Sequence, residues 1–264
     1  MVYVGANDGM LHGFNAKNTE TNPAKPAPGQ EIFAYIPNAL FPELSKLTSP
    51  TYTHQYYVDG ASAVGDVHDG TNWRTVLAGT TGAGARAVFG LDVTNPDAFG
   101  SSSVLWEFTS ADPTNGADLG YTLAQPSVVK LKLNDKWAVI VGNGYNSVNG
   151  HAVLFVLDAL TGDVLQAIDT GVGTTTDKNG LSSPIAVDTD NDRSVDTVYA
   201  GDLYGNLWKF DVSGSAGSWD VAYKSGTVNQ PLFTACTATT TCSPANRQPI
   251  TTKPNIGKPG GGRV

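Results

Sequence analysis

Basic residues, cysteines and long apolar runs are all scarce in this sequence of 264 residues. Lysine and arginine total 16 against 24 aspartates and glutamates, so the net charge is −8 and no basic surface is available for nucleic acid. The longest apolar runs, WAVIVG and HAVLFVL, fall far short of the roughly 20 residues that span a bilayer. We therefore expect no membrane-spanning segment and no nucleic-acid partner, and cations are better candidates.

Signatures of catalysis are also missing. The sequence has no GxSxG elbow, and its four histidines are scattered without metal-ligand spacing. The stretch TVLAGTTGAGARA loosely matches a dinucleotide fingerprint, but AVFGLDV after it alternates with the period of a strand, whereas the fingerprint needs a helix. We predict that the protein is not an enzyme. The histidines are His12, His54, His68 and His151.

The two cysteines, Cys236 and Cys242, lie in the polar segment CTATTTC. One pair without a second pair or a nearby histidine supplies too few ligands for structural zinc. The two residues either close a small surface disulfide, which we favour, or stay as unpaired thiols. A disulfide would indicate an oxidising compartment outside the cytoplasm.

One unit recurs along the chain. VYVGANDGMLHGFNA from Val2 and VYAGDLYGNLWKFDV from Val198 align without a gap, each as a strand ending in glycine, a turn and an alternating strand. Two more copies with longer turns begin at Thr75 and Ala138. Further short strands stand before three of these hairpins, and others follow them. Four strands per unit predict an all-β fold, a β-propeller of four-stranded antiparallel blades of the quinoprotein type.

The recurrence predicts one propeller domain over residues 1–264, as a partial or modified ring and as a fragment of a longer protein. Residues 19–57 are expected to be an insertion, with a Pro-rich loop and a short helix at NALFPELSKL. Residues 214–264 should hold the last strand of a blade, the cysteine-containing loop and the opening strand QPITTKPNI of another blade. That strand could instead pair beside MVYVGAND and close the ring.

The most specific feature of the sequence is DTDNDRSVD at 188–196, which places carboxylates at positions i, i+2, i+4 and i+8. In a tight loop this alternation directs oxygen ligands to one centre, as calcium requires. The run resembles the first nine positions of an EF-hand loop, in which position 7 gives a backbone carbonyl. The predicted calcium ligands are Asp188, Asp190, Asp192, Ser194 through its carbonyl, and Asp196.

Two departures argue against an EF-hand itself. Position 12 is Tyr199 instead of a bidentate glutamate, and position 6 is Arg193 where glycine normally makes the sharp turn. TVYAGD after the loop predicts a strand, so the loop should connect two strands of a sheet. The alternative is a solvated acidic turn without a metal, because aspartate and asparagine favour turns for local reasons.

Longer strings resemble the C-terminal propeller of the PilC/PilY family of type IV pilus biogenesis proteins and adhesins. They include MVYVGANDGMLHGF, YIPNALFPELSKLT, WRTVLAGTTGAGARAVFGLDVT, ADLGYTLAQPSVVKL and AVDTDNDRSVDTVYAGDLYGNLWKFD. The resemblance covers nearly the whole chain and implies a calcium-responsive propeller of seven or eight blades. It also implies the same five calcium ligands, with glycine favoured where this chain has Arg193.

The function that this resemblance implies is non-enzymatic. A calcium-binding propeller would act in an exported protein, in the periplasm or outer membrane and on the cell surface at the pilus tip. It would contact minor or major pilins and a host or abiotic surface, regulating pilus extension, retraction and adhesion. The alternative is a dehydrogenase that uses pyrroloquinoline quinone, because those enzymes share the propeller. Such an enzyme would place its calcium on the axis of a full ring.

Overall fold

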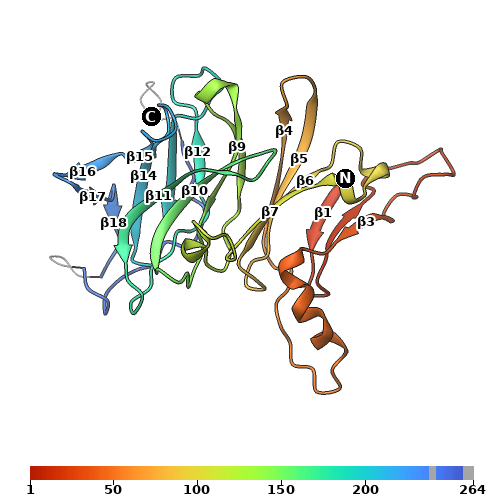
Figure 1. The fold of residues 1–264 in the computed structure, drawn as a ribbon, viewed down its shortest axis with the longest axis horizontal. Coiled ribbons are helices and arrows are strands. Elements are labelled where there is room, and N and C mark those ends of the chain that lie inside the picture. The colour runs from red at the N-terminus through yellow and green to blue at the C-terminus, as the bar shows by residue number, and fades with distance from the viewer. Residues whose placement is uncertain (238–241, 258–264) are drawn as a thin grey trace.

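The computed structural model describes residues 1–237 and 242–257, which fold into antiparallel sheets as the sequence predicts. Figure 1 shows the four main sheets side by side in chain order, with the N-terminus beside the first. We call them sheets I to IV. Each of the four predicted hairpins forms within one sheet, at its centre in sheets II to IV and at its edge in sheet I. The hairpins form because their strands alternate in period and their turns carry glycine.

The bounds of the strands follow the predicted units. Sheet I contains β1 (Val2–Gly5), β2 (Leu11–Phe14) and β3 (Glu31–Tyr35). Sheet II contains β4 (Ser62–His68), β5 (Trp73–Thr80), β6 (Ala87–Asp92) and β7 (Val104–Thr109). Sheet III contains β8 (Ser127–Lys130), β9 (Trp137–Gly142), β10 (His151–Asp158) and β11 (Val164–Gly173). Sheet IV contains β12 (Ile185–Val187), β13 (Thr197–Gly201), β14 (Asn206–Asp211), β15 (Asp220–Val221) and β18 (Phe233–Thr234).

The predicted insertion at 19–57 contains both a helix and a strand. The 3-10 helix η1 (Asn38–Thr48) lies where a short helix was expected, and it projects away from the sheets in Figure 1. Residues Glu31–Tyr35, which the sequence analysis had placed in the insertion, instead form β3 and pair with β2. The segment EIFAY is too short to reveal its alternation without a partner strand. Four shorter 3-10 helices are η2 (Pro96–Ala98), η3 (Ser101–Ser103), η4 (Gly116–Asp118) and η5 (Leu133–Asp135).

Three hydrophobic cores fill the spaces between successive sheets. The strand β9 contributes to two of these cores. Val139 and Val141 face the core shared with sheet II, whereas Ala138 and Ile140 face the core shared with sheet IV. Strands buried on both faces are apolar at every position, which explains the run WAVIVG. This stacking of sheets face to face is the packing of propeller blades.

Two of the strand-ending positions must be glycine, because the chain segment that follows the sheet passes too close for a side chain to fit. A Cβ on Gly142 would lie 2.2 Å from the carbonyl oxygen of Ser182, just ahead of β12. At Gly201 a Cβ would lie 2.3 Å from the side chain of Ile250. Because each lead-in segment crosses the turn end of the preceding sheet so closely, no side chain fits at these positions. Ile250 thus lies on sheet IV in the way that Ser182 lies on sheet III.

The C-terminal part departs from the prediction in two ways. The region after β15 forms a small hairpin from β16 (Tyr223–Ser225) and β17 (Val228–Gln230), and β18 then returns to pair with β14. The expected opening strand at 247–256 is not a strand. Its backbone makes an isolated bridge between Arg247 and Cys236, and the amides of Gln248 and Ile250 donate to the carbonyls of Ala235 and Asp202, at 3.1 and 3.0 Å. Without a neighbouring strand of its own, this segment has no ladder to join.

Ring closure through this segment does not occur in the described part of the chain. The strand β1 pairs with β2 alone, and the described C-terminal residues lie at the far side of sheet IV in Figure 1. Part of the predicted final region, 258–264, and residues 238–241 lie outside the described residues.

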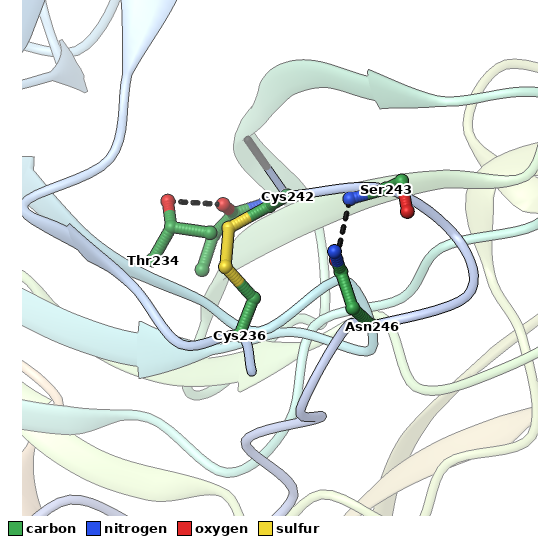
Figure 2. Close-up of a disulfide and its surroundings, with 6 residues drawn as sticks. Thr234, Cys236, Cys242, Ser243 and Asn246 are labelled. Atoms are coloured by element: carbon green, nitrogen blue, oxygen red, sulfur yellow. Dashed lines mark hydrogen bonds between the residues drawn. A yellow bond between two sulfur atoms is a disulfide. The ribbon is translucent and has the colours of Figure 1, made fainter. Parts of the chain in front are cut away.

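Figure 2 shows a disulfide joining Cys236 and Cys242 near the end of the chain, with Cα atoms 5.7 Å apart. On its C-terminal side the amide of Ser243 donates a hydrogen bond to the side-chain oxygen of Asn246, 2.6 Å away. Arg247 packs over the ring of Tyr204 and pairs with Asp177, which ties this loop to the end of sheet IV. The residues that follow the disulfide therefore lie against the turn end of the last sheet.

Candidate metal centre

The acid loop, defined as residues 188–196, connects the antiparallel strands β12 and β13. Val187 and Thr197 face each other across the two strands, and the amide of Asp196 donates to the carbonyl of Val187 at 3.0 Å. Strands flank the loop on both sides, so the expected departure from a helix-loop-helix EF-hand is confirmed. The sheet holds the two ends of the loop together, which forces its polar side chains into a small volume.

Asp188 organises the first half of the acid loop. Its Oδ1 accepts the amide of Asn191 at 2.6 Å, and its Oδ2 accepts the amide of Arg193 at 2.7 Å. Both donors have left-handed backbone conformations, with φ of 64° for Asn191 and 74° for Arg193. Asparagine tolerates this region, but arginine is strained there by roughly 1–2 kcal/mol. The sharp turn that glycine makes in related loops is thus made here by Arg193.

Three of the predicted carboxylates come together. Asp188, Asp190 and Asp196 each offer an oxygen, and these oxygens all lie within 4.8 Å of one another. Oxygens bound at 2.3–2.6 Å to one calcium ion are separated by up to about 5 Å, so this set fits the ion. In the described part of the chain, no other group of His, Cys, Asp and Glu side chains gathers in this way.

The other two predicted ligands lie at the edge of this set. Asp192 is not among the three clustered carboxylates, and its Oδ1 accepts the amide of Ser194 at 2.8 Å. Ser194 is buried, with 6% of its surface exposed. The hydrogen bond between them turns the chain back into β13.

Asp196 is the buried member of the cluster, with a side chain that is 8% exposed. Its Oδ2 accepts two hydrogen bonds from Thr189, one from the amide and one from the hydroxyl, both at 2.8 Å. Its Oδ1 is buried without a hydrogen bond, a state that only one other side-chain oxygen among the described residues shares. A buried carboxylate oxygen needs a compensating positive charge nearby.

A lysine from the neighbouring sheet supplies positive charge at this point. The ammonium of Lys132 lies 2.7 Å from Oδ2 of Asp190, 2.9 Å from Oδ1 of Asp196 and 3.2 Å from Oδ2 of Asp192. The contact to Asp190 is a hydrogen bond, whereas the contact to Asp196 is an ion pair without hydrogen-bond geometry. Sequence analysis missed Lys132, although the alternation of lysine and leucine in KLKLNDK indicates a basic strand face.

The backbone of sheet III fixes the position of Lys132. Beyond β8, Leu131 forms a parallel bridge with Val195, and the amide of Val195 donates to the carbonyl of Lys130 at 2.8 Å. Lys132 then begins the short helix η5. The bridge joins the two sheets next to the acid loop and places Lys132 beside the loop.

The pKa values of these groups reflect the shared charge. The hydrogen bond to Asp190 and the contacts to the other two acids raise the pKa of Lys132. The same hydrogen bond lowers the pKa of Asp190. Burial opposes ionisation of Asp196, but the hydrogen bonds from Thr189 and the charge of Lys132 outweigh it, so the pKa of Asp196 is also lowered. Asp190 and Asp196 are therefore ionised at neutral pH and available to a cation.

The site is open to solvent on one side. A cavity of about 510 Å³ lies against the acid loop, lined on the loop side by Lys132, Asp190 and Asp196 and on the other side by Lys209 and Tyr223. Hydrated ions can reach the carboxylates through it. The site therefore consists of a sheet-anchored acid loop with an accessible mouth.

The propeller-type arrangement of antiparallel sheets is shared with known proteins. A family model described as the PilY1 beta-propeller domain matches residues 1–256. A type IV pilus biogenesis factor PilY1 homolog of Xylella fastidiosa is 46% identical over 244 residues. The type IV pilus biogenesis factor PilY1 of Pseudomonas aeruginosa strain UCBPP-PA14 is 40% identical over 279 residues. The chain belongs to the PilY1 β-propeller family.

The match also holds in three dimensions. The crystal structure of the Pseudomonas aeruginosa PilY1 C-terminal domain superposes with a TM-score of 0.75 and 37% identity, over 97% of this chain and 49% of the crystallised chain. The sequence matches cover 89% and 97% of this chain but only 16% and 22% of the two curated relatives. In the described part of the chain, no helix has the length and apolar character needed to cross a membrane.

Proposed function

We propose that this chain is the calcium-binding propeller of an exported protein that acts at the tip of type IV pili. The acid loop binds one calcium ion, and its occupancy regulates pilus extension, retraction and surface adhesion. The gathering of the Asp188, Asp190 and Asp196 oxygens within 4.8 Å of one another, with the Asp196 side chain only 8% exposed, is the observation that carries the calcium assignment. The pilus role is supported by the family and by the names of the relatives.

The donor set favours calcium over other metals. All candidate ligands are oxygens, which hard cations prefer, and no histidine or cysteine belongs to the cluster. Asp188, Asp190 and Asp196 would hold the ion directly. Asp192 and the carbonyl of Ser194 are the proposed additional ligands. Flexible loops with several carboxylates accept the 6–8 oxygens of calcium more readily than the strict octahedron of magnesium.

Calcium would act through linkage. An ion that binds only the ordered loop stabilises that loop, by about 2.7 kcal/mol when free calcium exceeds Kd a hundredfold. Extracellular calcium modules commonly have Kd values of about 0.1–1 mM, so environmental calcium can change the occupancy of such a site. The ordered end of sheet IV would then present a defined surface to pilins or to a host or abiotic surface.

The quinoprotein alternative has less support. The acid loop belongs to one connection at the end of sheet IV, whereas a quinoprotein needs its calcium beside the cofactor on the propeller axis. The relatives are named as pilus biogenesis factors. We propose a role in binding and regulation without catalysis.

Calorimetric titration with calcium tests the site. The wild-type chain is expected to bind one ion, and Asp196→Asn is expected to abolish measurable binding because the buried negative charge is lost while the shape is kept. Asp220→Asn is the matched control, since Asp220 lies in β15 of the same sheet and pairs with Lys224 outside the loop. Equal binding by wild type and Asp196→Asn would disprove the ligand assignment.

The pilus role needs a test in cells. The Asp196→Asn change, placed in the parent organism, is expected to alter surface piliation and twitching motility and to remove their dependence on calcium. Unchanged piliation and motility at low and high calcium would contradict regulation while leaving the binding site intact as a structural one.

A further inference from the structure

We propose that Lys132 is a tethered competitor of the metal, so that calcium enters the acid loop only by expelling a lysine of the neighbouring sheet. This inference rests on the proposed calcium site and adds to it a residue that sets affinity and selectivity. It starts from one observation: an ammonium group of sheet III lies among carboxylates of sheet IV at distances of 2.7–3.2 Å.

The ammonium and the metal need the same oxygens. Lys132 contacts Asp190 and Asp196, two of the three clustered carboxylates. It is also the one cation within ion-pair distance of Asp196 among the described residues. A calcium ion bound to the same two acids would lie within a few ångströms of the nitrogen atom, where two positive charges repel strongly. Simultaneous occupation is therefore excluded, and the two cations compete.

Competition with a tethered charge makes the loop selective for divalent ions. Sodium or potassium would replace one positive charge by another and would gain nothing over the ammonium, which is held at high local concentration by its own backbone. Calcium brings two charges to a loop that has four carboxylates, three of them clustered. The gain in attraction can then exceed the loss of the three lysine contacts.

Expulsion of Lys132 would affect its side chain more than its backbone. The bridge between Leu131 and Val195 and the hydrogen bond from Leu131 to the carbonyl of Lys136 hold the start and end of the turn. The Lys132 side chain is 31% exposed and borders the open cavity, so it has space to move into. Calcium would thereby break the ion pairs between the two sheets and leave Lys132 as a free surface lysine.

The first test measures calcium affinity in two lysine variants of the 264-residue chain. Lys132→Met removes the competing charge and keeps the length of the side chain, and we expect calcium to bind at least tenfold more tightly. Lys136→Met is the matched control, because Lys136 lies in the same turn but pairs with Asp158, away from the acid loop. We expect its calcium affinity to equal that of the wild type.

The second test follows the lysine in the wild-type protein. Brief acetylation with a succinimidyl ester, read for each lysine by mass spectrometry, should label Lys132 several times more in saturating calcium than in chelator. Labelling of Lys136 should not change. This measurement does not depend on whether the Lys132→Met variant folds.

The outcomes separate this inference from the proposed function. If the wild type binds calcium but Lys132→Met binds no more tightly and labelling of Lys132 is constant, competition is wrong and the calcium site stands. If Lys132→Met binds calcium where the wild type shows none, competition is confirmed, and Lys132 outcompetes calcium in the wild type. If neither protein binds calcium, both ideas fail.

Discussion

Two turns occupy equivalent places in sheets II and IV, but the charges of their acidic residues are balanced in different ways. The turn between β4 and β5, at residues 68–73, has one central carboxylate, Asp69. It accepts the amides of Thr71 and Asn72 and the guanidinium of Arg74, at 2.7–2.9 Å. The acid loop between β12 and β13 has four carboxylates and obtains its lysine from another sheet.

The difference shows what separates a structural turn from a binding loop. In the first turn the partners of Asp69 are all supplied within five residues, and Gly70 takes the left-handed position with φ of 97°. The charge is balanced locally and nothing more is needed. In the acid loop, a buried oxygen of Asp196 lacks a hydrogen bond and arginine occupies a strained position. Surplus negative charge and strain in a short loop are features that a bound cation would stabilise.

The largest expected effect concerns stability in calcium. At free calcium a hundredfold above Kd, the free energy of unfolding of the wild type should rise by about 2.7 kcal/mol relative to chelator. Asp188→Asn should lose this gain, because one ligand charge and the acceptor for the amide of Arg193 are removed. Asp69→Asn, the equivalent change in the first turn, should keep it. Thermal unfolding with calcium and with chelator measures all three, and a retained gain in Asp188→Asn would contradict the comparison.

A second change breaks the first turn while sparing the acid loop. Arg74 bridges Asp69 at 2.7 Å and Asp92 at 3.0 Å, so Arg74→Met leaves both acids without their cation. We expect the unfolding temperature to fall by about 2–4 °C, as for a loss near 1 kcal/mol in a domain of this size. The fall should be the same with and without calcium. A fall that calcium reverses would show that the two turns are coupled.

The pH dependence of the acid loop should follow Lys132. Because the lysine lowers the pKa of Asp190, this carboxylate contributes stability above its ordinary pKa of about 4, and the contribution is lost as pH falls through the lower folded value. In metal-free Lys132→Met the pKa of Asp190 should rise towards its ordinary value, because the hydrogen bond from the lysine is lost. Carbon-detected NMR titration of the carboxyl groups measures this shift. An unchanged pKa for Asp190 would show that the lysine is not held in the loop in solution.

The smallest effect concerns the strained arginine. Arg193→Gly relieves a left-handed arginine, a gain of roughly 1 kcal/mol in the ordered loop, offset in part by the greater freedom of glycine in the unfolded chain. We expect stability to change little and calcium to bind up to about fivefold more tightly. Calorimetry compares this variant with Asn191→Gly, where asparagine is already tolerated and the gain should be smaller. Weaker binding by Arg193→Gly would mean that the arginine assists the ion.

Local patterns predicted a large part of this structure. Alternation and glycine turns predict the four hairpins and the sheets of four or five strands around three of them. The carboxylate spacing predicts the position of the acid loop between strands. The prediction was weaker where a segment depends on distant partners. The strand β3 needed β2 beside it, and Arg247–Ile256 did not become a strand.

The order of residues alone settled the propeller units and the carboxylates that could hold a metal, because side-chain period and turn chemistry act over a few neighbours. The packing of sheet III against sheet IV determined which cationic side chain, Lys132, lies beside those carboxylates. Lys132 and Asp190 are 58 positions apart, and only the bridge between Leu131 and Val195 brings them within 2.7 Å. Long-range electrostatic partners depend on how the sheets stack, and that information is spread over every strand of both cores.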